Sequence, residues 1–263
     1  QGLMTGFDSE EDVWELIVRY TGNLDKVREI NGVDVRELSN GYAVLNVKKE
    51  LIDEVANVEE IIYIEKPTAL IFSLLRGKQA SCINEVQQTF ANNENNGLFG
   101  EGVIVGIADS GIDFTHEAFR NQDGTTRILN LWDQTNDRVY NAEEINEALK
   151  SENPYESVNS VDYSGHGTHV AGIAAGNFAE NKNDNLGIAT KSSLVIVKMA
   201  LAGERSFPRT TQLMEAVDYM IKVAESYKMP LAMNLSFGNS YGSHDGTSLL
   251  SIYLDSMADG RRV

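Results

Sequence analysis

A continuous apolar run, Val103–Ala108, most constrains how this chain of 263 residues can fold. Such a run predicts a strand buried on both faces, which is typical of a parallel sheet covered by helices. Strand and helix patterns alternate after residue 101, so we expect an α/β fold with a parallel sheet between helical layers. The other expected strands are Ile128–Trp132, Leu194–Met199 and Leu231–Phe237, and the expected helices are Thr168–Phe178, Thr211–Tyr227 and Thr247–Met257.

Residues 11–66 carry a different pattern, that of a small α+β unit. Alternating apolar residues and helical spacings give the order β-α-β-β-α-β, which is that of a ferredoxin-like module. Asn40-Gly41 marks a tight turn between the two middle strands, and Pro67 ends the last strand. The expected strands are Leu16–Tyr20, Val33–Leu38, Tyr42–Val47 and Ile61–Ile64, and the expected helices are Leu24–Ile30 and Lys49–Ala56.

The chain has a formal net charge of −17, from 22 basic and 39 acidic residues. Nucleic-acid binding needs clustered Lys and Arg, so this charge argues against a nucleic-acid partner and indicates a solvated acidic surface. No apolar run approaches the roughly 18 residues that a membrane span needs. The single cysteine, Cys82, excludes an internal disulfide, so nothing in the chain demands an oxidising compartment.

Two short motifs contain the residue types that acid–base catalysis needs. Asp109 directly follows the apolar strand, and reactive groups collect at the carboxyl ends of strands in open α/β sheets. His166 lies between two glycines at the start of an expected helix, which leaves one face of its imidazole open. A buried carboxylate facing an imidazole fixes its tautomer and stabilises its protonated form. The alternative interpretation is a helix-capping Asp and a structural His.

In this order the two motifs resemble one family. Asp109–Asp113 and His166–Gly172 are similar to the first two signatures of the subtilisin-like serine proteases, and Met233–Gly238 is similar to the third. The resemblance implies a serine endopeptidase with a subtilisin-like fold that hydrolyses protein substrates. It also implies that Asp109 orients His166 and that His166 acts as general base and then as general acid.

The third signature implies where a substrate binds. In the family, its last residues line the primary specificity pocket and pair with the substrate backbone, which gives Ser236, Phe237 and Gly238 this role. The segment 206–208 would form the opposite wall. The substrate would then lie as a strand between two others.

The resemblance also assigns the N-terminal module. Subtilisin-like proteases are made with a ferredoxin-like propeptide that assists folding and then inhibits the enzyme, and its last strand resembles Ile61–Glu65. We therefore expect residues 1–78 to be the propeptide with its cleavage-site tail, and residues 79–263 to be the N-terminal part of the catalytic domain. Self-cleavage is expected within Leu70–Lys78, so the chain's own propeptide is one of its partners.

The nucleophilic serine of the family is expected outside this chain. Gly246–Leu250 imitates the serine motif, but it follows the specificity strand almost at once and no proline comes after it. We therefore reject Ser248 as the nucleophile and expect it on a surface helix. A C-terminal, serine-bearing half of the same protein is the expected partner that completes the triad.

No cofactor and no metal are expected. His116-Glu117 begins like a zinc motif but lacks the second His. Family members often bind calcium. Here Ala118 stands where an Asp is usual and the loop 181–185 departs from the calcium-loop pattern, which argues against calcium. His169 is expected to be a core residue of its helix.

The long insert between Asp109 and His166 is similar to that of clostridial subtilases. Among them are the Csp germination proteases, which activate a cortex-lytic zymogen in spores. That resemblance implies the same role and a spore- or cell-associated location; if the chain is not of the Csp type, we expect a secreted protein. The alternative is a pseudoprotease, an inactive regulator that binds a protease or its substrate through the retained cleft.

Overall fold

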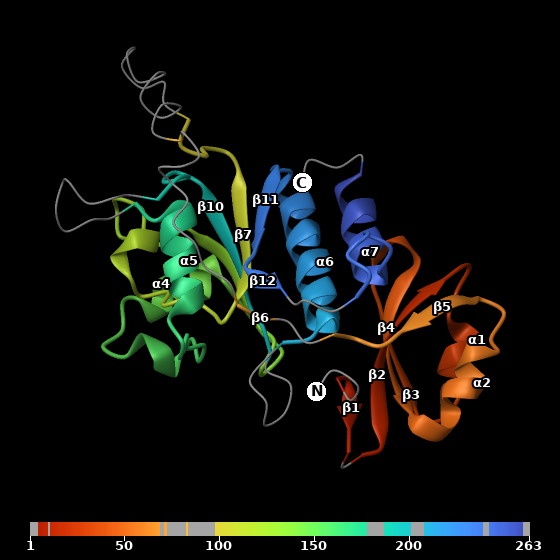
Figure 1. Ribbon diagram of the computed structural model, residues 1–263. Coiled ribbons are helices and arrows are strands. Elements are labelled where there is room, and N and C mark those ends of the chain that lie inside the picture. The colour runs from red at the N-terminus through yellow and green to blue at the C-terminus, as the bar shows by residue number, and fades with distance from the viewer. Residues whose placement is uncertain are drawn as a thin grey trace. The chain divides into compact units, whose positions relative to one another are not determined.

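The parallel sheet expected from the apolar run is present in the computed structural model (Figure 1). The structure describes residues 5–9, 11–68, 71–72, 83, 98–177, 187–200, 208–238 and 242–259. The chain divides into two compact units, the first from residues 1–71, 201–218 and 238–261 and the second from residues 72–200, 219–237 and 262–263.

The second unit is built on a mixed sheet with the strand order β11-β7-β10-β8-β9. The first four strands in this order are parallel, and β9 pairs with β8 in the antiparallel sense. Its strands are β7 (Ile104–Asp109), β8 (Ile128–Asp133), β9 (Arg138–Asn141), β10 (Ser193–Lys198) and β11 (Leu231–Leu235). The α/β fold class expected from the sequence is confirmed.

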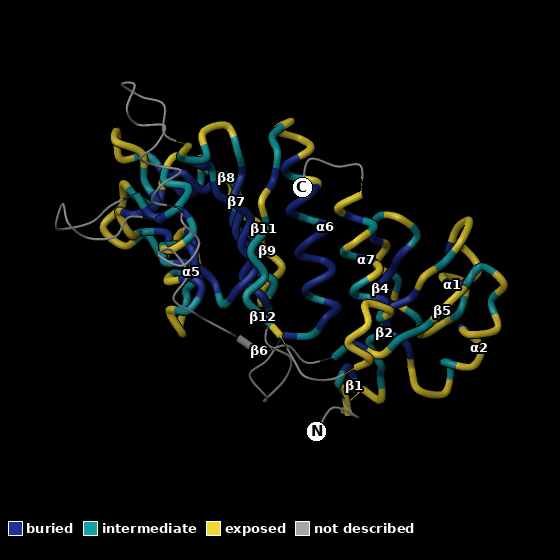
Figure 2. The backbone as a smooth tube through the Cα atoms, turned by 45° about the horizontal axis from the view of Figure 1, so that its top comes forward, coloured by how far each residue is buried: buried dark blue, intermediate teal, exposed yellow. Residues whose placement is uncertain are grey.

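Helices pack on both faces of this sheet, which explains the apolar run of β7. Val105 and Ile107 belong to the core on the side of α5 (His166–Ala175), together with Val170. Gly106 points the other way, where an added Cβ would lie 2.7 Å from the sulfur of Met220 in α6 (Thr210–Tyr227). A side chain at residue 106 would therefore collide with α6, so both faces of β7 are covered (Figure 2).

The insert between β7 and α5 contains elements that the sequence patterns did not predict. They are η4 (Glu117–Phe119), the hairpin strand β9, α4 (Ala142–Ala148) and η5 (Pro154–Glu156). Asn141 caps α4 through a capping box with Glu144, and the sequence signal of such a box is a capping residue followed three positions later by Glu.

The first unit contains an antiparallel sheet in which β5 pairs with β2 and the rest follows the order β1-β2-β4-β3. Strands β2, β3, β4 and β5 reproduce the expected β-α-β-β-α-β pattern, and β1 adds an unpredicted edge. The elements are β1 (Phe7–Asp8), β2 (Val13–Tyr20), α1 (Asp25–Arg28), β3 (Val33–Glu37), η2 (Ser39–Gly41), β4 (Tyr42–Lys48), η3 (Lys49–Leu51), α2 (Ile52–Ala56) and β5 (Ile61–Glu65). Both helices are shorter than their apolar spacing predicts, and the second begins with the 3-10 turn η3.

Both faces of β4 are buried within the first unit. Leu45 belongs to the cluster that contains Val27 of α1 and Val55 of α2. Tyr42 contacts Tyr253 of α7 (Leu249–Ala258), with ring centroids 5.1 Å apart in an edge-on arrangement. Residues 210–218 of α6 and the whole of α7 are thus part of the same compact unit as the N-terminal sheet.

A buried arginine holds the loops around the start of β8 together. Arg127 is 6% exposed and donates to the backbone carbonyls of Ala175 (2.7 Å), Ala189 (3.1 Å) and Ser192 (2.8 Å). Burial lowers the pKa of Arg127 to about 10, so the guanidinium remains charged at neutral pH. A buried cation is tolerated here because its planar fork satisfies several carbonyls at once.

Replacing Arg127 by Met is expected to lower the free energy of unfolding by about 3 kcal/mol or more, because several buried carbonyls lose their donor. Urea denaturation of the full-length protein measures this. Arg138→Met is the matched control, since Arg138 is exposed and its contacts are a surface cation–π contact with Tyr140 and an ion pair with Glu144, the latter worth less than about 1 kcal/mol. Equal effects of the two substitutions would contradict the role assigned to Arg127.

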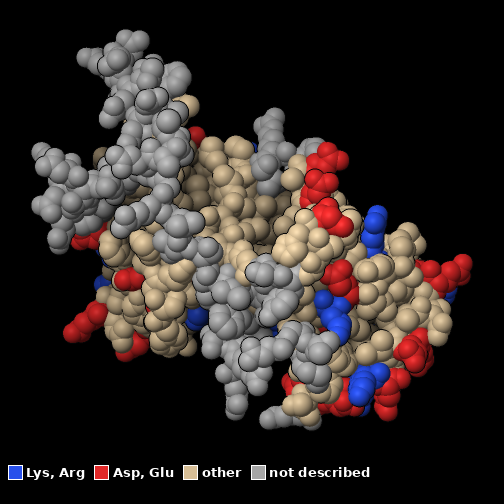
Figure 3. Space-filling view, viewed as in Figure 1, with Lys and Arg blue, Asp and Glu red and all other residues tan. Residues whose placement is uncertain are grey.

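On the face shown in Figure 3, carboxylates gather in groups with a few Lys and Arg near them, and most of the other described surface is uncharged. No helix within the described part of the chain is long and apolar enough to cross a membrane.

Candidate active site

The structure brings Asp109 and His166 into contact. Asp109 is the last residue of β7 and is fully buried. His166 is the first residue of α5, and its Nδ1 lies 2.7 Å from Oδ1 of Asp109. The same carboxylate oxygen accepts a hydrogen bond from the backbone N–H of Ser110, at 2.7 Å. An imidazole with its Nδ1 proton on a carboxylate presents Nε2 as the atom that can take up a proton.

The surroundings of Asp109 affect its protonation. Burial raises the pKa of Asp109 above the ordinary carboxyl value, and the hydrogen bonds from His166 and Ser110 oppose this shift. The side chain of His166 is 18% exposed, whereas that of Asp109 is inaccessible. The imidazole is therefore partly exposed, but its Nε2 atom is buried in this structure, as the carboxylate is. A fully buried carboxylate behind a less buried imidazole is the arrangement that a histidine base oriented by a carboxylate requires.

Close packing of α5 against the end of β7 fixes this contact. An added Cβ on Gly167 would lie 2.1 Å from the carbonyl oxygen of Gly111 and 3.1 Å from Cβ of Asp109. Only glycine fits at residue 167, because any side chain would push the first turn of α5 away from Asp109. Gly165, which precedes the helix, has a positive φ of 71° and lets the chain turn into it.

Side chains satisfy each of the first backbone N–H groups of α5, where a helix has no internal acceptors. Asp162 accepts from the N–H groups of Gly165 (3.0 Å) and Thr168 (2.9 Å). The Oγ of Ser164 accepts from the N–H of His166 (3.1 Å), and the Oγ of Ser110 accepts from the N–H of Gly167 (2.9 Å). The first turn of α5, which carries His166, is therefore held in a single position.

Asp162 is the centre of this network. Its carboxylate also accepts from the hydroxyls of Ser110 and Thr168, both at 2.7 Å. Burial alone raises the pKa of Asp162, but hydrogen bonds from Thr168, Ser110 and Gly165 together outweigh it and leave the pKa below its ordinary value. Sequence reasoning missed Asp162 and Ser110. An Asp shortly before a helix start is a capping signal that could have indicated Asp162.

Replacing Asp162 by Ala is expected to lower the free energy of unfolding by about 2 to 3 kcal/mol, since the start of α5 loses its main acceptor. The folded-state pKa of Asp162 is lowered, so its contribution is present above the ordinary carboxyl pKa of about 4 and is lost as the pH falls through the folded-state pKa. The difference between wild type and variant should therefore shrink in acid. Urea denaturation at pH 7 and pH 3 tests this. Asp123→Ala, which removes an exposed carboxylate that binds Thr125, is the control.

The expected substrate-binding residues lie at the same sheet edge as Asp109. Leu235 of β11 is in register with Ala108 of β7, so Ser236 comes directly after β11 where β7 ends. Phe237 and Gly238 form the short strand β12 (Phe237–Gly238), which pairs with β6 (Ile71–Phe72), shown in Figure 1. Of the expected opposite wall, residues 206 and 207 lie outside the described residues, as do most residues of the expected cleavage region and the loop 181–185.

Two other predicted residues have clear places in the structure. Ser248 is the N-cap of α7, and its Oγ accepts from the backbone N–H of Ser251 at 3.1 Å. This is a helix-capping role, as its position on a helix predicts. His169 was expected in the core of its helix, but this was wrong. It is exposed, because Val170, and not His169, points toward the sheet.

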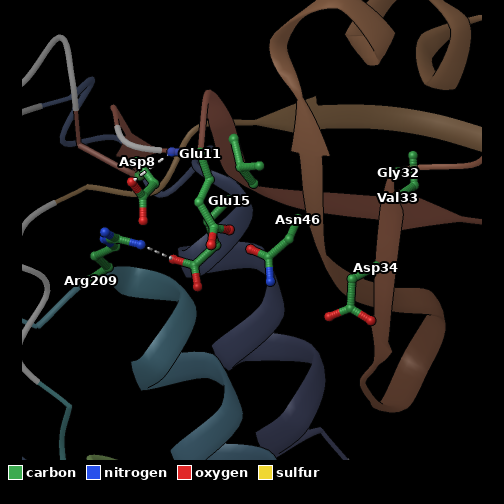
Figure 4. A pocket seen from close by; sticks show the side chains of 10 residues that line it. Asp8, Glu11, Glu15, Gly32, Val33, Asp34, Asn46 and Arg209 are labelled. Atoms are coloured by element: carbon green, nitrogen blue, oxygen red, sulfur yellow. Dashed lines mark hydrogen bonds and ion pairs between the residues drawn. The ribbon is translucent and has the colours of Figure 1, made fainter.

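A separate cavity of about 470 Å³ occurs within the first unit (Figure 4). Arg209 lines it and donates to Glu15 at 3.1 Å. The cavity contains none of the predicted site residues. Within the described part of the chain, no three acidic, His or Cys side chains gather in the way a metal site needs.

Comparison with known proteins identifies the family. The model of the subtilase family matches residues 100–260, more than half of the chain, and this match contains Asp109 and His166. The chain belongs to the subtilase family. Residues 1–68 of this subtilase match the model of the Csp protease B prodomain, so it consists of a prodomain followed by subtilase sequence.

Individual relatives agree with this assignment. The subtilase is 29% identical to the major intracellular serine protease of Bacillus subtilis over 126 residues, which is 48% of this chain and 32% of that protein. The solved structure of the Clostridium perfringens CspB protease is 40% identical, with a TM-score of 0.63, over 70% of this chain and 38% of that one. Fervidolysin from Fervidobacterium pennivorans, a keratinolytic enzyme related to subtilisin, shares the fold at 16% identity, with a TM-score of 0.56, over 92% of this chain and 37% of that one. The chain thus spans less than half the length of each of these relatives.

Proposed function

We propose that this chain supplies the prodomain and the Asp–His part of a serine endopeptidase of the subtilisin type. The observation that carries the proposal is the 2.7 Å contact between Nδ1 of His166 and Oδ1 of the buried Asp109, at the carboxyl end of a parallel sheet. The contact has the geometry of a base and the group that orients it. The match of residues 100–260 to the subtilase family supports the same reaction class.

In the proposed reaction, a serine in the remainder of the protein attacks the carbonyl carbon of the scissile peptide bond, and Nε2 of His166 takes the hydroxyl proton. The protonated imidazole then gives this proton to the leaving amine, and an acyl-enzyme forms. Water, deprotonated by His166, hydrolyses the acyl-enzyme and regenerates the serine. Asp109 keeps the Nδ1 proton in place and stabilises the imidazolium.

Substrate recognition is proposed at Ser236, Phe237 and Gly238. The pairing of β12 with β6 supports this role, because residues 71–72 then lie against β12 as an extended substrate segment would. The same pairing supports an inhibitory prodomain, since β6 lies within the expected cleavage region, residues 70–78. Cleavage there and release of the prodomain would free β12 for a protein substrate.

We propose that the substrate class is a protein zymogen, and that its activation degrades spore cortex during germination. Two findings support this finer assignment. They are the match of residues 1–68 to the Csp protease B prodomain and the 40% identity to a solved CspB protease. Incubating the full-length protein with a purified cortex-lytic zymogen and following its mass tests it. If the enzyme hydrolyses other proteins but leaves the mass of the zymogen unchanged, the germination role is contradicted and the proposed endopeptidase activity stands.

The enzyme class is tested by labelling the full-length protein with a fluorophosphonate, which reacts with an activated serine. Wild type should be labelled after prodomain cleavage, and His166→Ala should not be. His169→Ala is the matched control on the same helix and should be labelled like wild type. Failure of wild type to react, with the prodomain removed, would favour the inactive binding protein over the enzyme.

A further inference from the structure

A row of charged residues crosses the carboxyl edge of the sheet in the second unit. Lys198 of β10 is in register with Asp109 of β7 on one side and with Asp133 of β8 on the other. Neighbours in register on parallel strands point to the same face of a sheet, so the three side chains lie side by side. The lysine is therefore part of the surroundings of Asp109, and the reaction proposed above does not use it.

Lys198 is held firmly in this row. Its side chain is 11% exposed, and its Nζ lies 2.9 Å from Oδ2 of the fully buried Asp133. Burial alone raises the pKa of Asp133, but hydrogen bonds that include those from Thr135 and Lys198 outweigh it and lower the pKa. The ion pair fixes the position of the ammonium group because leaving either charge unpaired in this site would be costly.

The ammonium group of Lys198 supports an exposed aromatic ring. Its Nζ lies 5.7 Å from the centroid of the Tyr163 ring, over the ring face, which is a cation–π contact. Tyr163 is nevertheless 87% exposed, the largest exposed fraction among the large apolar side chains described. It lies three residues before His166, directly after Asp162, in the segment whose hydrogen bonds hold the start of α5. The ring is thus presented to solvent close to His166 in the chain, with the ammonium group of Lys198 over one of its faces.

We infer that Tyr163 is a specificity-determining residue, and that its open ring face binds an apolar side chain of the substrate next to the scissile bond. This inference rests on the proposed function. A rigid aromatic ring provides a large contact area with little loss of conformational freedom on binding. The lysine on the other ring face draws electron density toward itself, so this ring favours apolar over cationic side chains.

The inference is tested on the full-length protein with internally quenched peptides. At each position flanking the scissile bond, the residue is varied among Ala, Leu, Phe and Lys. For wild type we expect Leu and Phe to be preferred over Ala and Lys at one of these positions. Tyr163→Ala should raise KM for the Leu and Phe peptides roughly tenfold, with little change in kcat and no change for the Ala peptide.

Two controls separate the ring from other effects. Tyr163→Phe keeps the ring and should retain the preference of wild type. Tyr227→Ala removes another exposed tyrosine, at the end of α6, and should also leave the preference unchanged. An identical preference profile in wild type and Tyr163→Ala would overturn the inference, whereas normal fluorophosphonate labelling of both would leave the proposed function standing.

The same peptides test the inference if the protein hydrolyses none of them. Their equilibrium affinities for the full-length protein, measured by fluorescence anisotropy with and without Tyr163→Ala, should show the same roughly tenfold loss for the Leu and Phe peptides alone. Equal peptide affinities of the proteins with Tyr163 and with Tyr163→Ala would contradict a substrate-contacting role of Tyr163, whether or not the protein is active.

Discussion

Replacing His166 by Ala in the full-length protein is expected to lower kcat for peptide hydrolysis by about 10⁵- to 10⁶-fold. The reason is that the base, its orienting carboxylate and the nucleophile act as one unit, so removing the base leaves only the contribution of substrate binding and oxyanion stabilisation. Steady-state kinetics on a fluorogenic peptide measure this. His169→Ala is the control, because His169 is exposed on the same helix and should retain activity within about twofold.

Asp109→Asn separates the role of Asp109 in orienting His166 from its contribution to the stability of the folded protein. The amide keeps the size of the side chain but cannot stabilise the imidazolium or fix the same tautomer of His166, so kcat should fall by about 10⁴-fold. The folded-state pKa of Asp109 is raised, which means that ionised Asp109 lowers stability as the pH rises through the interval between its unfolded and folded pKa values. Asparagine does not ionise, and we expect no loss of stability at pH 7. A variant that unfolds readily but retains kcat would contradict the role assigned to Asp109.

Gly167→Ala is expected to reduce both kcat and stability. Because the new Cβ would lie 2.1 Å from the carbonyl oxygen of Gly111, the first turn of α5 must move by about an ångström or more. Such a shift separates His166 from Asp109. Displacements of this size reduce kcat by about 10²-fold or more, and overpacking lowers the free energy of unfolding by about 1 to 3 kcal/mol. Peptide kinetics and urea denaturation measure the two effects.

Gly172→Ala is the matched control for this prediction. Gly172 lies in the same helix, and no described atom would lie within 4 Å of an added Cβ. Because alanine favours helix more than glycine does, this variant should be as stable as wild type or more stable, by up to about 1 kcal/mol, with normal kcat. If the two alanine variants behaved alike, close packing of α5 on the end of β7 would not be what holds His166 in place.

Much of the fold could be predicted from local patterns. The run Val103–Ala108 became β7 with a shift of one residue, because burial on both faces demands apolar residues at every position. The N-terminal order of strands and helices was also correct. The patterns missed β9 and α4, since the exposed strand residues Arg138 and Val139 do not alternate clearly with buried ones. They also made α1 and α2 too long, because apolar spacing marks the buried face of a helix but not its ends.

The candidate site was predicted in part. Asp109 and His166 were found because each stands in a distinctive motif at an element boundary. Ser110 was missed because it accepts a hydrogen bond from a helix start more than fifty residues away in the chain. Asp162 was missed because its role depends on the turn that directly precedes that helix. Lys198 was not predicted as part of the site, because a lysine at the end of an apolar strand is common and indicates no partner.

The sequence by itself determined the α/β alternation, the two charged motifs and the family that they indicate, because periodicity and motif spacing are local properties of the chain. Only the tertiary structure decided that His166 meets Asp109 at 2.7 Å, and that Tyr163 lies over Lys198. These contacts depend on how closely α5 and the strands pack. The separation between α5 and the end of β7 is set by small residues such as Gly167, which contacts Gly111. The arrangement of the strand ends depends on buried ion pairs such as Lys198 with Asp133, whose two members are far apart in the sequence.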